Sequence, residues 1–361
     1  MPVESLGNLR QTRDLPLVPL LESTGRQSGR NIAAPAKYFN RQGKHLPNSM
    51  PGRAREVRHV EIADLAGQRV DNFLMSELSG VPRSRVYGML RKGEVRVNGG
   101  RIRPDYRLKA GDVVRIPPWH GPAPNERAVP APALLDQLAG RIIYQDAAVI
   151  VLDKPAGLAV HGGSGIQHGV IESLRVLFPD ERGLELAHRL DRDTSGCLVL
   201  ARNRSALLEL HAAFRDASVS KTYDVLVYGT WPRKLRSVHA HLDRFVTRSG
   251  ERRVRAVPEG KSSRTEFSIV QSGERASWVR AHPHTGRTHQ IRVHSLVSGH
   301  PVVGDEKYAP DALLAQSRES GIRRLCLHAS SVAFAIKGQF RRYDAPIPAD
   351  FTDAWRRLGG T

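Results

Sequence analysis

A proline-rich stretch divides this chain of 361 residues into two unequal parts. Prolines stand at positions 117, 118, 122, 124, 130 and 132, and each one restricts φ and removes a backbone donor. Such a stretch favours an extended polyproline conformation and interrupts helices and central strands. We therefore predict a linker at 118–133, a small module before it at 56–117 and a larger domain after it at 134–358.

The segment before the small module differs in composition. Residues 1–55 mix Arg, Gln, Asn, Ser, Pro and Gly without a sustained apolar period, which predicts a disordered, basic leader. A run that begins at Met50 would also serve as a start of translation. Glu4, Asp14 and Glu22 argue against an organelle transit peptide, because such segments avoid acidic residues.

The charge balance indicates the kind of partner. The 55 Lys and Arg residues exceed the 36 Asp and Glu residues and give a net charge of +19. Hydrophobic residues make up 40% of the chain, which suffices for a core. The excess positive charge favours a polyanionic partner and excludes a storage protein for acidic ligands.

Two absences from the sequence bear on the compartment. No run approaches the roughly 18 apolar residues of a membrane span, and no charged-then-apolar signal segment begins the chain. We therefore expect a soluble, cytoplasmic protein that does not contact membranes. Cys197 and Cys326 each lie in an apolar run, which favours buried thiols over a disulfide or a cysteine-based metal site.

The small module has the pattern of two short helices followed by strands. Apolar residues at helical spacing predict a helix that begins near Val70, and a second helical stretch follows Pro82 and ends at Gly93. A hairpin of 95–97 and 101–103 is expected about the Asn-Gly turn at 98–99, with a closing strand at 113–116.

The segment from residue 83 to residue 103 contains seven Lys and Arg residues but only one acidic residue, Glu94. We call them the basic cluster: Arg83, Arg85, Arg91, Lys92, Arg96, Arg101 and Arg103. A small module with such a segment is typical of nucleic-acid binding. The alternative is a solvated helix face, although such a face usually carries interleaved acids.

The larger domain has the pattern of an α+β fold. Its predicted strands are 142–144, 149–152, 197–201, 223–228, 264–270, 276–281 and 325–336, and its predicted helices are 171–178, 204–215 and 288–298. Strands outnumber helices without regular alternation, which favours a mainly antiparallel, mixed sheet over a doubly wound nucleotide fold.

The loop at 188–196 is the first candidate for chemistry. It carries Asp191 and Asp193 beside Arg189 and Arg192 and leads directly into an apolar strand. A neighbouring guanidinium favours the ionised form of an Asp, which can then act as a nucleophile or a base. Either carboxylate could fill that role, and the alternative is a polar turn with surface ion pairs.

A second candidate is the cluster of four histidines at 282, 284, 289 and 294. Its spacing matches no zinc signature, so we expect no metal. A helix predicted to start near Thr288 would carry His289 and Arg292 one turn apart, and its first amides with Arg287 would attract an anion.

Two further positions are ambiguous in the sequence. Tyr223 alternates with Val225 and Val227 on one face of a strand, where it could pack in the core or stack on a base. Lys154 ends another strand at a turn and could contact phosphate or solvent.

These segments resemble the RluA family of pseudouridine synthases, from about residue 60 to the C-terminus. The resemblance rests on four motifs in the family's order: Asp-Lys-Pro-Ala-Gly-Leu at 153–158, His-Arg-Leu-Asp at 188–191 with Thr-Ser-Gly at 194–196, Lys-Thr-Tyr at 221–223, and Gly-Arg-Thr-His-Gln-Ile-Arg-Val-His at 286–294. The small module resembles the RNA-binding module named after ribosomal small-subunit protein four. Its phrase at 90–98 is similar to that of members acting on large-subunit rRNA.

The resemblance implies that uridine in RNA is isomerised to pseudouridine without a cofactor. It points to Asp191 rather than Asp193 as the essential aspartate, which would attack the sugar, attack the base or abstract the sugar 2′ proton. It further implies that Arg292 pairs with Asp191, that Tyr223 stacks under the uracil and assists proton loss from carbon 5, and that Arg189 replaces the extruded base.

Three functions stay open at this point: the synthase, a non-catalytic RNA-binding or ribosome-assembly factor, and a metal-dependent hydrolase built on the histidines. For a synthase, the predicted partner is large-subunit rRNA or its assembly precursor, with tRNA as the alternative substrate. We expect a monomer.

Overall fold

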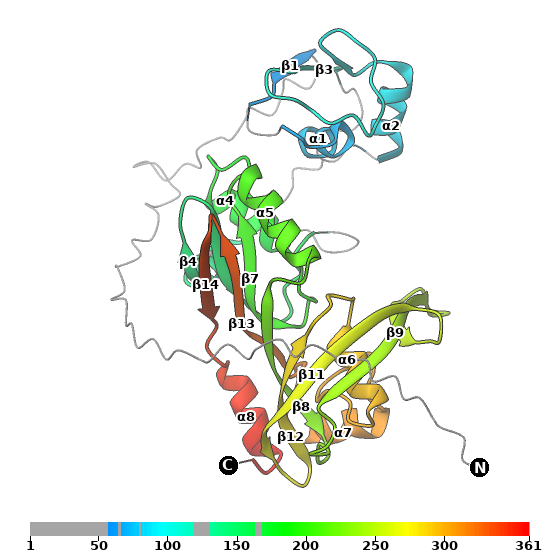
Figure 1. Ribbon diagram of the computed structural model, residues 1–361, viewed down its shortest axis with the longest axis vertical. Helices are drawn as coiled ribbons and strands as arrows, with labels where there is room; N and C mark the ends of the chain where they lie inside the picture. Colours follow the sequence, from blue (N-terminus) through cyan, green and yellow to red (C-terminus); the bar gives the residue numbers. More distant parts are fainter. Residues whose placement is uncertain are drawn as a thin grey trace, which may run out of the picture. The chain divides into compact units, whose positions relative to one another are not determined.

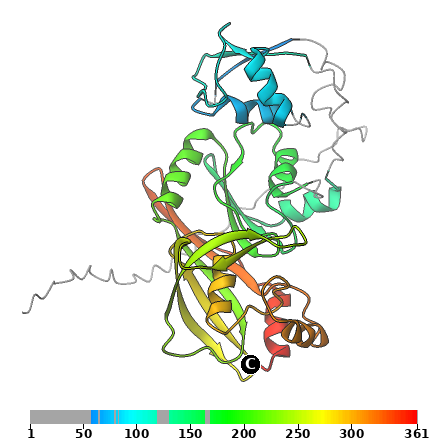
Figure 2. The ribbon, with the colours of Figure 1, turned by 90° about the vertical axis from the view of Figure 1, so that its right-hand side faces the viewer.

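The computed structural model describes residues 57–63, 66–78, 81, 83–118, 130–162 and 168–360 (Figures 1 and 2). The predicted leader, its Met50 and the central part of the predicted linker lie outside these residues. The described residues form a small module at 57–118 and a large domain at 130–360. No helix in these ranges has the length and apolarity needed to cross a membrane.

The small module contains both predicted helices. Its elements are β1 (Arg58–Glu61), α1 (Val70–Glu77), α2 (Arg83–Lys92), β2 (Arg96–Val97) and β3 (Val113–Ile116). The strands pair in the order β1-β3-β2. The apolar faces of the two helices, including Phe73 and Met89, pack with Val114 and Ile116 in one buried cluster. A core of this size gives the module a fixed shape.

The predicted hairpin of 95–97 and 101–103 is wrong. Residues 101–103 form no strand, and β2 pairs instead with β3, with Val97 opposite Val114. The reason lies in the turn: the Asn98 amide donates to Asp112 at 2.9 Å and its oxygen accepts from the Val113 amide at 2.8 Å. These bonds fix the turn against the strand that follows it later in the chain.

The large domain is built on one mixed sheet of eleven strands. The strands are β4 (Ile142–Gln145), β5 (Val149–Lys154), β6 (Glu185–Leu186), β7 (Ser195–Ala201), β8 (Ser220–Tyr228), β9 (Ser237–Val246), β10 (Arg252–Ala256), β11 (Lys261–Ser272), β12 (Ala276–Pro283), β13 (Leu327–Ile336) and β14 (Gln339–Asp344). The order is β10-β9-β11-β12-β8-β13-β7-β5-β4, with β14 paired to β13 and β6 to β7. Among these described strands only β13 and β7 pair in parallel, so the predicted α+β class with a mainly antiparallel sheet is confirmed.

The helices of this domain cover both faces of the sheet. They are α3 (Pro132–Ala139), α4 (Val170–Leu177), α5 (Arg204–Arg215), α6 (Gln290–Val297), α7 (Asp311–Glu319) and α8 (Ala349–Arg357). Helix α3 begins at Pro132, inside the predicted linker, because proline at the first helical position lacks only an amide that would be unpaired there.

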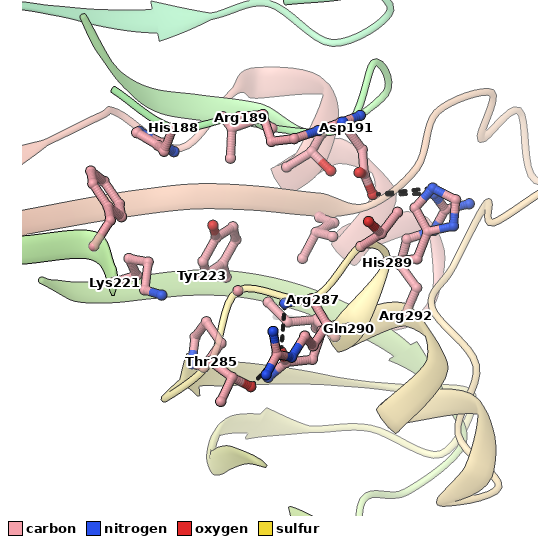
Figure 3. A pocket seen from close by; sticks show the side chains of 18 of the residues that line it. His188, Arg189, Asp191, Lys221, Tyr223, Thr285, Arg287, His289, Gln290 and Arg292 are labelled. Atoms are coloured by element: carbon pink, nitrogen blue, oxygen red, sulfur yellow. Dashed lines mark hydrogen bonds and ion pairs between the residues drawn. The ribbon is translucent and has the colours of Figure 1, made fainter. Parts of the chain in front are cut away.

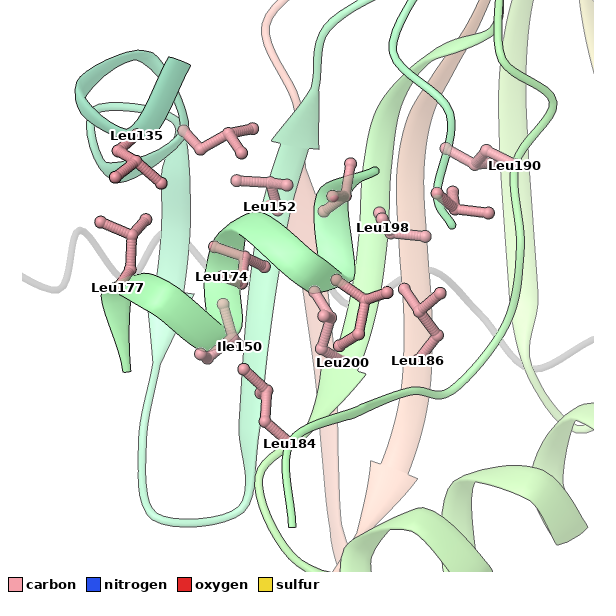
Figure 4. Close-up of a cluster of buried hydrophobic side chains, with 14 of the residues drawn as sticks. Leu135, Ile150, Leu152, Leu174, Leu177, Leu184, Leu186, Leu190, Leu198 and Leu200 are labelled. Atoms are coloured by element: carbon pink, nitrogen blue, oxygen red, sulfur yellow. The ribbon is translucent and has the colours of Figure 1, made fainter. Parts of the chain in front are cut away.

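The half of the sheet around β5 and β7 is buried on both faces. Ile150 and Leu152 of β5 pack with Leu174 of α4 on one face (Figure 4), whereas Val149 and Val151 pack on the other face in the cluster that contains α5 residues. Since successive strand residues point to opposite faces, two covered faces require the continuous apolar runs that the sequence shows.

The other half is arranged in the same way around β8. Val225 and Val227 pack with Ile291 of α6, and Leu226 packs with Phe351 of α8 on the opposite face. Figure 1 shows α8 beside β8 and β12 at the end of the chain. Helix α6 therefore sits on the face to which Tyr223 of β8 also points.

All seven strands predicted for this domain are present, with ends that differ by a few residues. Helices α4 and α5 match their predictions closely, but α6 begins two residues later than expected. His289 precedes it with φ 54° and ψ 19°, a left-handed conformation that a right-handed helix cannot contain. Strands β6, β9, β10 and β14 and helices α3, α7 and α8 were not predicted. The residues of β9 and β10 alternate mostly between exposed and half-buried positions.

Gly196 of β7 lies opposite Ala329 of β13, where these two strands pair in parallel. Its φ is +105°, and a Cβ atom at this position would lie 2.2 Å from the carbonyl oxygen of Ala329. We predict that Gly196→Ala lowers the free energy of unfolding by about 1–3 kcal/mol more than Gly250→Ala, because overpacking adds to the backbone strain. Gly250 has φ +82°, and a Cβ atom there would meet no other atom within 4 Å, so it is the matched control. Urea denaturation gives both values, and equal losses would contradict the prediction.

Candidate active site

A cavity of about 350 Å³ lies where the 188–191 loop, β8 and the segment before α6 meet. Figure 3 shows Asp191, His289 and Arg292 together at one end, with Lys221 and His188 toward the other and Tyr223 between them. The charged lining is mostly cationic: Asp191 faces Arg189, Lys221, Arg244, Arg287 and Arg292. Such a lining favours a polyanion.

The loop that carries Asp191 is pinned at its start by His188. The Nε2 atom of His188 accepts a hydrogen bond from the Val199 amide at 3.0 Å, and the ring stacks on Phe214 with centroids 4.6 Å apart. Burial, followed by the charge of Lys221, lowers the pKa of His188 to about 3. The imidazole is therefore a neutral acceptor that fixes the loop to β7.

Lys154 fixes the same loop from the other side. Its Nζ atom donates at 2.8 Å to the carbonyl oxygens of Pro155, Leu158 and Arg192, and the residue is fully buried. Burial lowers the pKa of Lys154 to about 7, although Asp193 and Asp191 act in the opposite direction. Lys154 thus contacts neither phosphate nor solvent, the two alternatives that the sequence suggested.

Arg292 joins Asp191 to a second carboxylate. Its Nε and one terminal nitrogen donate to the two oxygens of Asp305 at 2.7 and 2.6 Å, while the other terminal nitrogen reaches Asp191 Oδ2 at 3.4 Å. Burial opposes the charge of Arg292, but Asp305 and then Asp191 raise its pKa above the usual value. Arg292 is therefore a permanently charged, buried anchor.

The two aspartates of the loop have different surroundings in the structure. Asp191 lines the cavity, with a side chain 19% exposed. Asp193 pairs with its neighbour Arg192 at 2.9 Å and is 34% exposed. Of the two carboxylates, only that of Asp191 combines access to the cavity with the buried guanidinium of Arg292.

Tyr223 projects from β8 into the cavity (Figure 3). Burial, followed by the charge of Asp191, raises the pKa of Tyr223 above its usual value. The phenol consequently keeps its proton at neutral pH, so its ring and a hydroxyl donor are what it presents to a ligand.

The segment before α6 is held by Gln290. Its Oε1 accepts from the Thr285 hydroxyl at 2.7 Å and from the Arg287 amide at 3.0 Å, and its Nε2 donates to Arg264 O and Thr265 Oγ1. These bonds fix the backbone that carries Arg287, whose exposed side chain lines the cavity.

The four histidines of the predicted cluster have four different partners. The first two contact Thr222 and Glu266, and the last two contact Tyr308 and Ser263. Within the described ranges, no group of three or more His, Cys, Asp or Glu residues could hold a metal ion. The geometry therefore gives the hydrolase interpretation no support.

Sequence reasoning missed three contributors to this site. Arg244 on β9 lines the cavity and donates to Thr288 Oγ1 at 2.6 Å. Asp305 and Tyr308 follow an apolar run and a glycine, a pattern that indicates a turn and nothing of Arg292. Only contacts between segments distant in the chain identify them.

The basic cluster of the small module is largely solvent-accessible. Arg91, Lys92 and Arg96 are exposed, whereas Arg85 forms an ion pair with Glu94 at 2.9 Å. Arg83 begins α2. The one acid of the segment therefore offsets one of its cations.

Comparison with known proteins identifies the family. Family models match at two places, "RNA pseudouridylate synthase" at residues 148–296 and "S4 domain" at 68–114. The chain is 49% identical over 290 residues to ribosomal large subunit pseudouridine synthase C of Escherichia coli K12, covering 79% of this chain and 91% of that protein. The chain belongs to the RNA pseudouridylate synthase family. The enzyme of the same name from Salmonella typhimurium is also 49% identical, over 81% of this chain and 93% of its own.

A solved structure agrees with this membership. Human RNA pseudouridylate synthase domain containing 4 superposes with a TM-score of 0.53 at 25% identity, over 63% of this chain and 96% of that one. The expected RluA-type family and the synthase and RNA-binding modules are thereby confirmed. The family is one of isomerases, which makes this chain an enzyme.

The role of Lys154 can be tested by Lys154→Met, which keeps an unbranched side chain one atom shorter and removes the ammonium group that donates to three buried carbonyls. We predict a loss of about 2–4 kcal/mol in the free energy of unfolding, since each unpaired buried acceptor costs about 1–3 kcal/mol and some relaxation offsets this. Hydrogen exchange at residues 191–194 should accelerate in the same variant. The exposed Lys109 supplies the control Lys109→Met, and unchanged exchange in Lys154→Met would contradict the role.

Proposed function

We propose that this protein isomerises specific uridines of large-subunit rRNA to pseudouridine, with Asp191 as the essential residue. The observation that carries the proposal is the Asp191 carboxylate, set in a cationic cavity opposite Tyr223 and joined to the buried Arg292. The choice of rRNA is supported by the names of the relatives that are 49% identical to this chain.

The bonds and protons of the proposed isomerisation balance within the uridine itself. The bond between N1 and the sugar C1′ breaks, a bond between C5 and C1′ forms, C5 loses a proton, and N1 gains one. Neither electrons nor water are consumed. An ionised carboxylate such as that of Asp191 supplies the nucleophile or base that the first step needs.

The other lining residues take complementary roles in this proposal. Arg292 orients Asp191, the ring of Tyr223 stacks against the uracil, and Arg189 at the exposed edge of the cavity occupies the space that the extruded base leaves. Extrusion of a base costs a few kcal/mol, which stacking and phosphate contacts offset. Tyr223 also assists the loss of the C5 proton in this proposal.

Binding of the surrounding RNA is assigned to cations outside the reacting centre. Arg287 contacts phosphate beside the cavity, and the basic cluster, with Arg83, Arg85, Arg91, Lys92 and Arg96, binds the rRNA backbone through the S4 module. This division is supported by the exposure of Arg91, Lys92 and Arg96 and by the S4 match.

The proposal includes the setting in which the enzyme acts. It acts as a monomer in the cytoplasm, where rRNA and its assembly precursors are found, and its domains are those delimited by the proline-rich linker. The two buried, unpaired cysteines fit a reducing compartment.

The central test is Asp191→Asn. Purified variant should convert no uridine in rRNA that lacks pseudouridine, because an amide cannot act as the nucleophile or base, while its affinity for the RNA stays close to that of the wild type. Tritium release from RNA labelled at C5 of uridine measures conversion. Asp193→Asn is the matched control and should retain activity.

Conversion that survives in Asp191→Asn would overturn the assignment of this residue. Wild-type protein that binds rRNA tightly but releases no tritium would favour the assembly-factor alternative. Pseudouridine mapping of rRNA and tRNA from a strain lacking the gene then identifies the modified positions, and losses confined to tRNA would overturn the choice of rRNA.

The S4 assignment predicts a change in salt dependence. Replacing Arg91, Lys92 and Arg96 by Ser should weaken rRNA binding and reduce the slope of log K against log salt by about 0.7–0.9 for each phosphate that the protein no longer neutralises. Filter binding at several salt concentrations measures the slope. Lys109→Ser, an exposed cation of the same module outside the cluster, should leave it nearly unchanged.

A further inference from the structure

We infer that His289 is a positioning residue for Asp191 and that Tyr308 sets the orientation of its imidazole. The inference rests on the proposed function, since it concerns the carboxylate assigned to catalysis. His289 Nε2 lies 3.8 Å from Asp191 Oδ2, and His289 Nδ1 lies 2.6 Å from the Tyr308 hydroxyl oxygen. Figure 3 shows the imidazole beside Asp191.

The hydrogen bonds of Tyr308 determine which ring nitrogen carries the proton. Its hydroxyl oxygen accepts from the amide of Val254 on β10 at 2.9 Å. In the part of the chain that the structure describes, this oxygen has Val254 and His289 as its hydrogen-bond partners. The oxygen could also accept from an Nδ1–H group, but the hydroxyl proton would then have no acceptor among the described residues. We therefore assign that proton to the bond with His289 Nδ1, which leaves the proton of the neutral imidazole on Nε2, the nitrogen that faces Asp191.

The backbone at His289 supports a functional interpretation. The residue has φ 54° and ψ 19°, a conformation that costs free energy for any residue with a Cβ atom and occurs often at functional sites. Gln290 holds this turn through its bonds to Thr285 and Arg287. The rigid turn places the imidazole between Tyr308 and Asp191 rather than along the helix.

Burial favours the neutral form of the His289 imidazole, and the surrounding charges act in both directions. Burial lowers its pKa, the carboxylates of Asp191 and Asp305 oppose that effect, and Arg292 and Lys307 add to it. Lys307 in turn pairs with Glu251 of the β9–β10 hairpin at 2.6 Å. A neutral Nε2–H group attracts the carboxylate without neutralising it.

The distances give His289 a distinct task. The Oδ2 atom of Asp191 lies 3.4 Å from a terminal nitrogen of Arg292 and 3.8 Å from Nε2 of His289. Both distances exceed the ideal length of a hydrogen bond. Both donors lie near the same oxygen, so their attraction orients the carboxylate. Because neither forms a short hydrogen bond, the carboxylate can still turn toward a reacting atom. Tyr308 also lies under Arg292, with the guanidinium carbon 5.0 Å from its ring centroid, so one side chain supports both donors.

The test compares two replacements of His289 that differ in reach. Asn tolerates the left-handed backbone but is too short to reach Asp191, whereas Gln can place an N–H group near the position of Nε2. We expect His289→Asn to slow single-turnover pseudouridine formation by up to about 100-fold, the size of a misplacement effect, with unchanged affinity for the rRNA. His289→Gln should recover much of that rate.

Tyr308→Phe tests the link between the two side chains and keeps the ring under Arg292. It should slow the same step in the wild-type background but have little further effect in His289→Asn, because its contribution passes through His289. In protein labelled with ¹⁵N-histidine, the signals of His289 should show a proton on Nε2, and Tyr308→Phe should give a mixture of tautomers. His211→Asn, an exposed histidine of α5, is the control for the replacement itself.

Each outcome separates this inference from the proposed function. Wild-type protein without tritium release overturns both. Active wild-type protein with equally active His289→Asn overturns the inference alone, as does a proton found on Nδ1. Effects of Tyr308→Phe and His289→Asn that multiply in the double variant overturn the link through Tyr308.

Discussion

The site depends on one buried charge, the guanidinium of Arg292, which is 3% exposed. An isolated charge of this kind would be strongly destabilising, and Asp305 compensates it with two short hydrogen bonds. One terminal nitrogen remains for Asp191 at the longer distance of 3.4 Å. The arrangement requires three separate segments to meet: the loop before β7, helix α6 and the turn that follows it.

The sheet supplies the rigidity that this meeting requires. Strands β5 and β7 are buried on both faces, and the Asp191 loop is attached to them by His188 at its start and Lys154 near its end. The close approach of Gly196 to β13 fixes where that loop rejoins the sheet. Buried polar contacts of this kind converge on the loop that carries Asp191 and allow it little displacement.

The cations of the chain lie in three kinds of place: buried at the site, exposed at the cavity, and exposed on the small module. Arg292 is buried and acts on one carboxylate, whereas Arg189 and Arg287 are exposed at the cavity. The exposed cations of the basic cluster lie in a different module altogether. A net charge of +19 therefore combines a few cations with specific geometry and many that raise affinity for a polyanion without discriminating among sequences.

The sequence by itself determined the α+β class, the two modules, most strands of the sheet and the segments that form the site, because apolar periodicity and short motifs are local properties. It could not decide between Asp191 and Asp193 from chemistry alone, and it predicted the wrong partner for 95–97. Nor did it indicate Asp305, Tyr308 or the burial of Lys154. Only the tertiary structure decided the partner of 95–97 and the places of Asp305, Tyr308 and Lys154. Each depends on a contact between residues distant in the chain: Val97 with Val114, Asp305 with Arg292, Tyr308 with His289, and Lys154 with the carbonyl of Arg192.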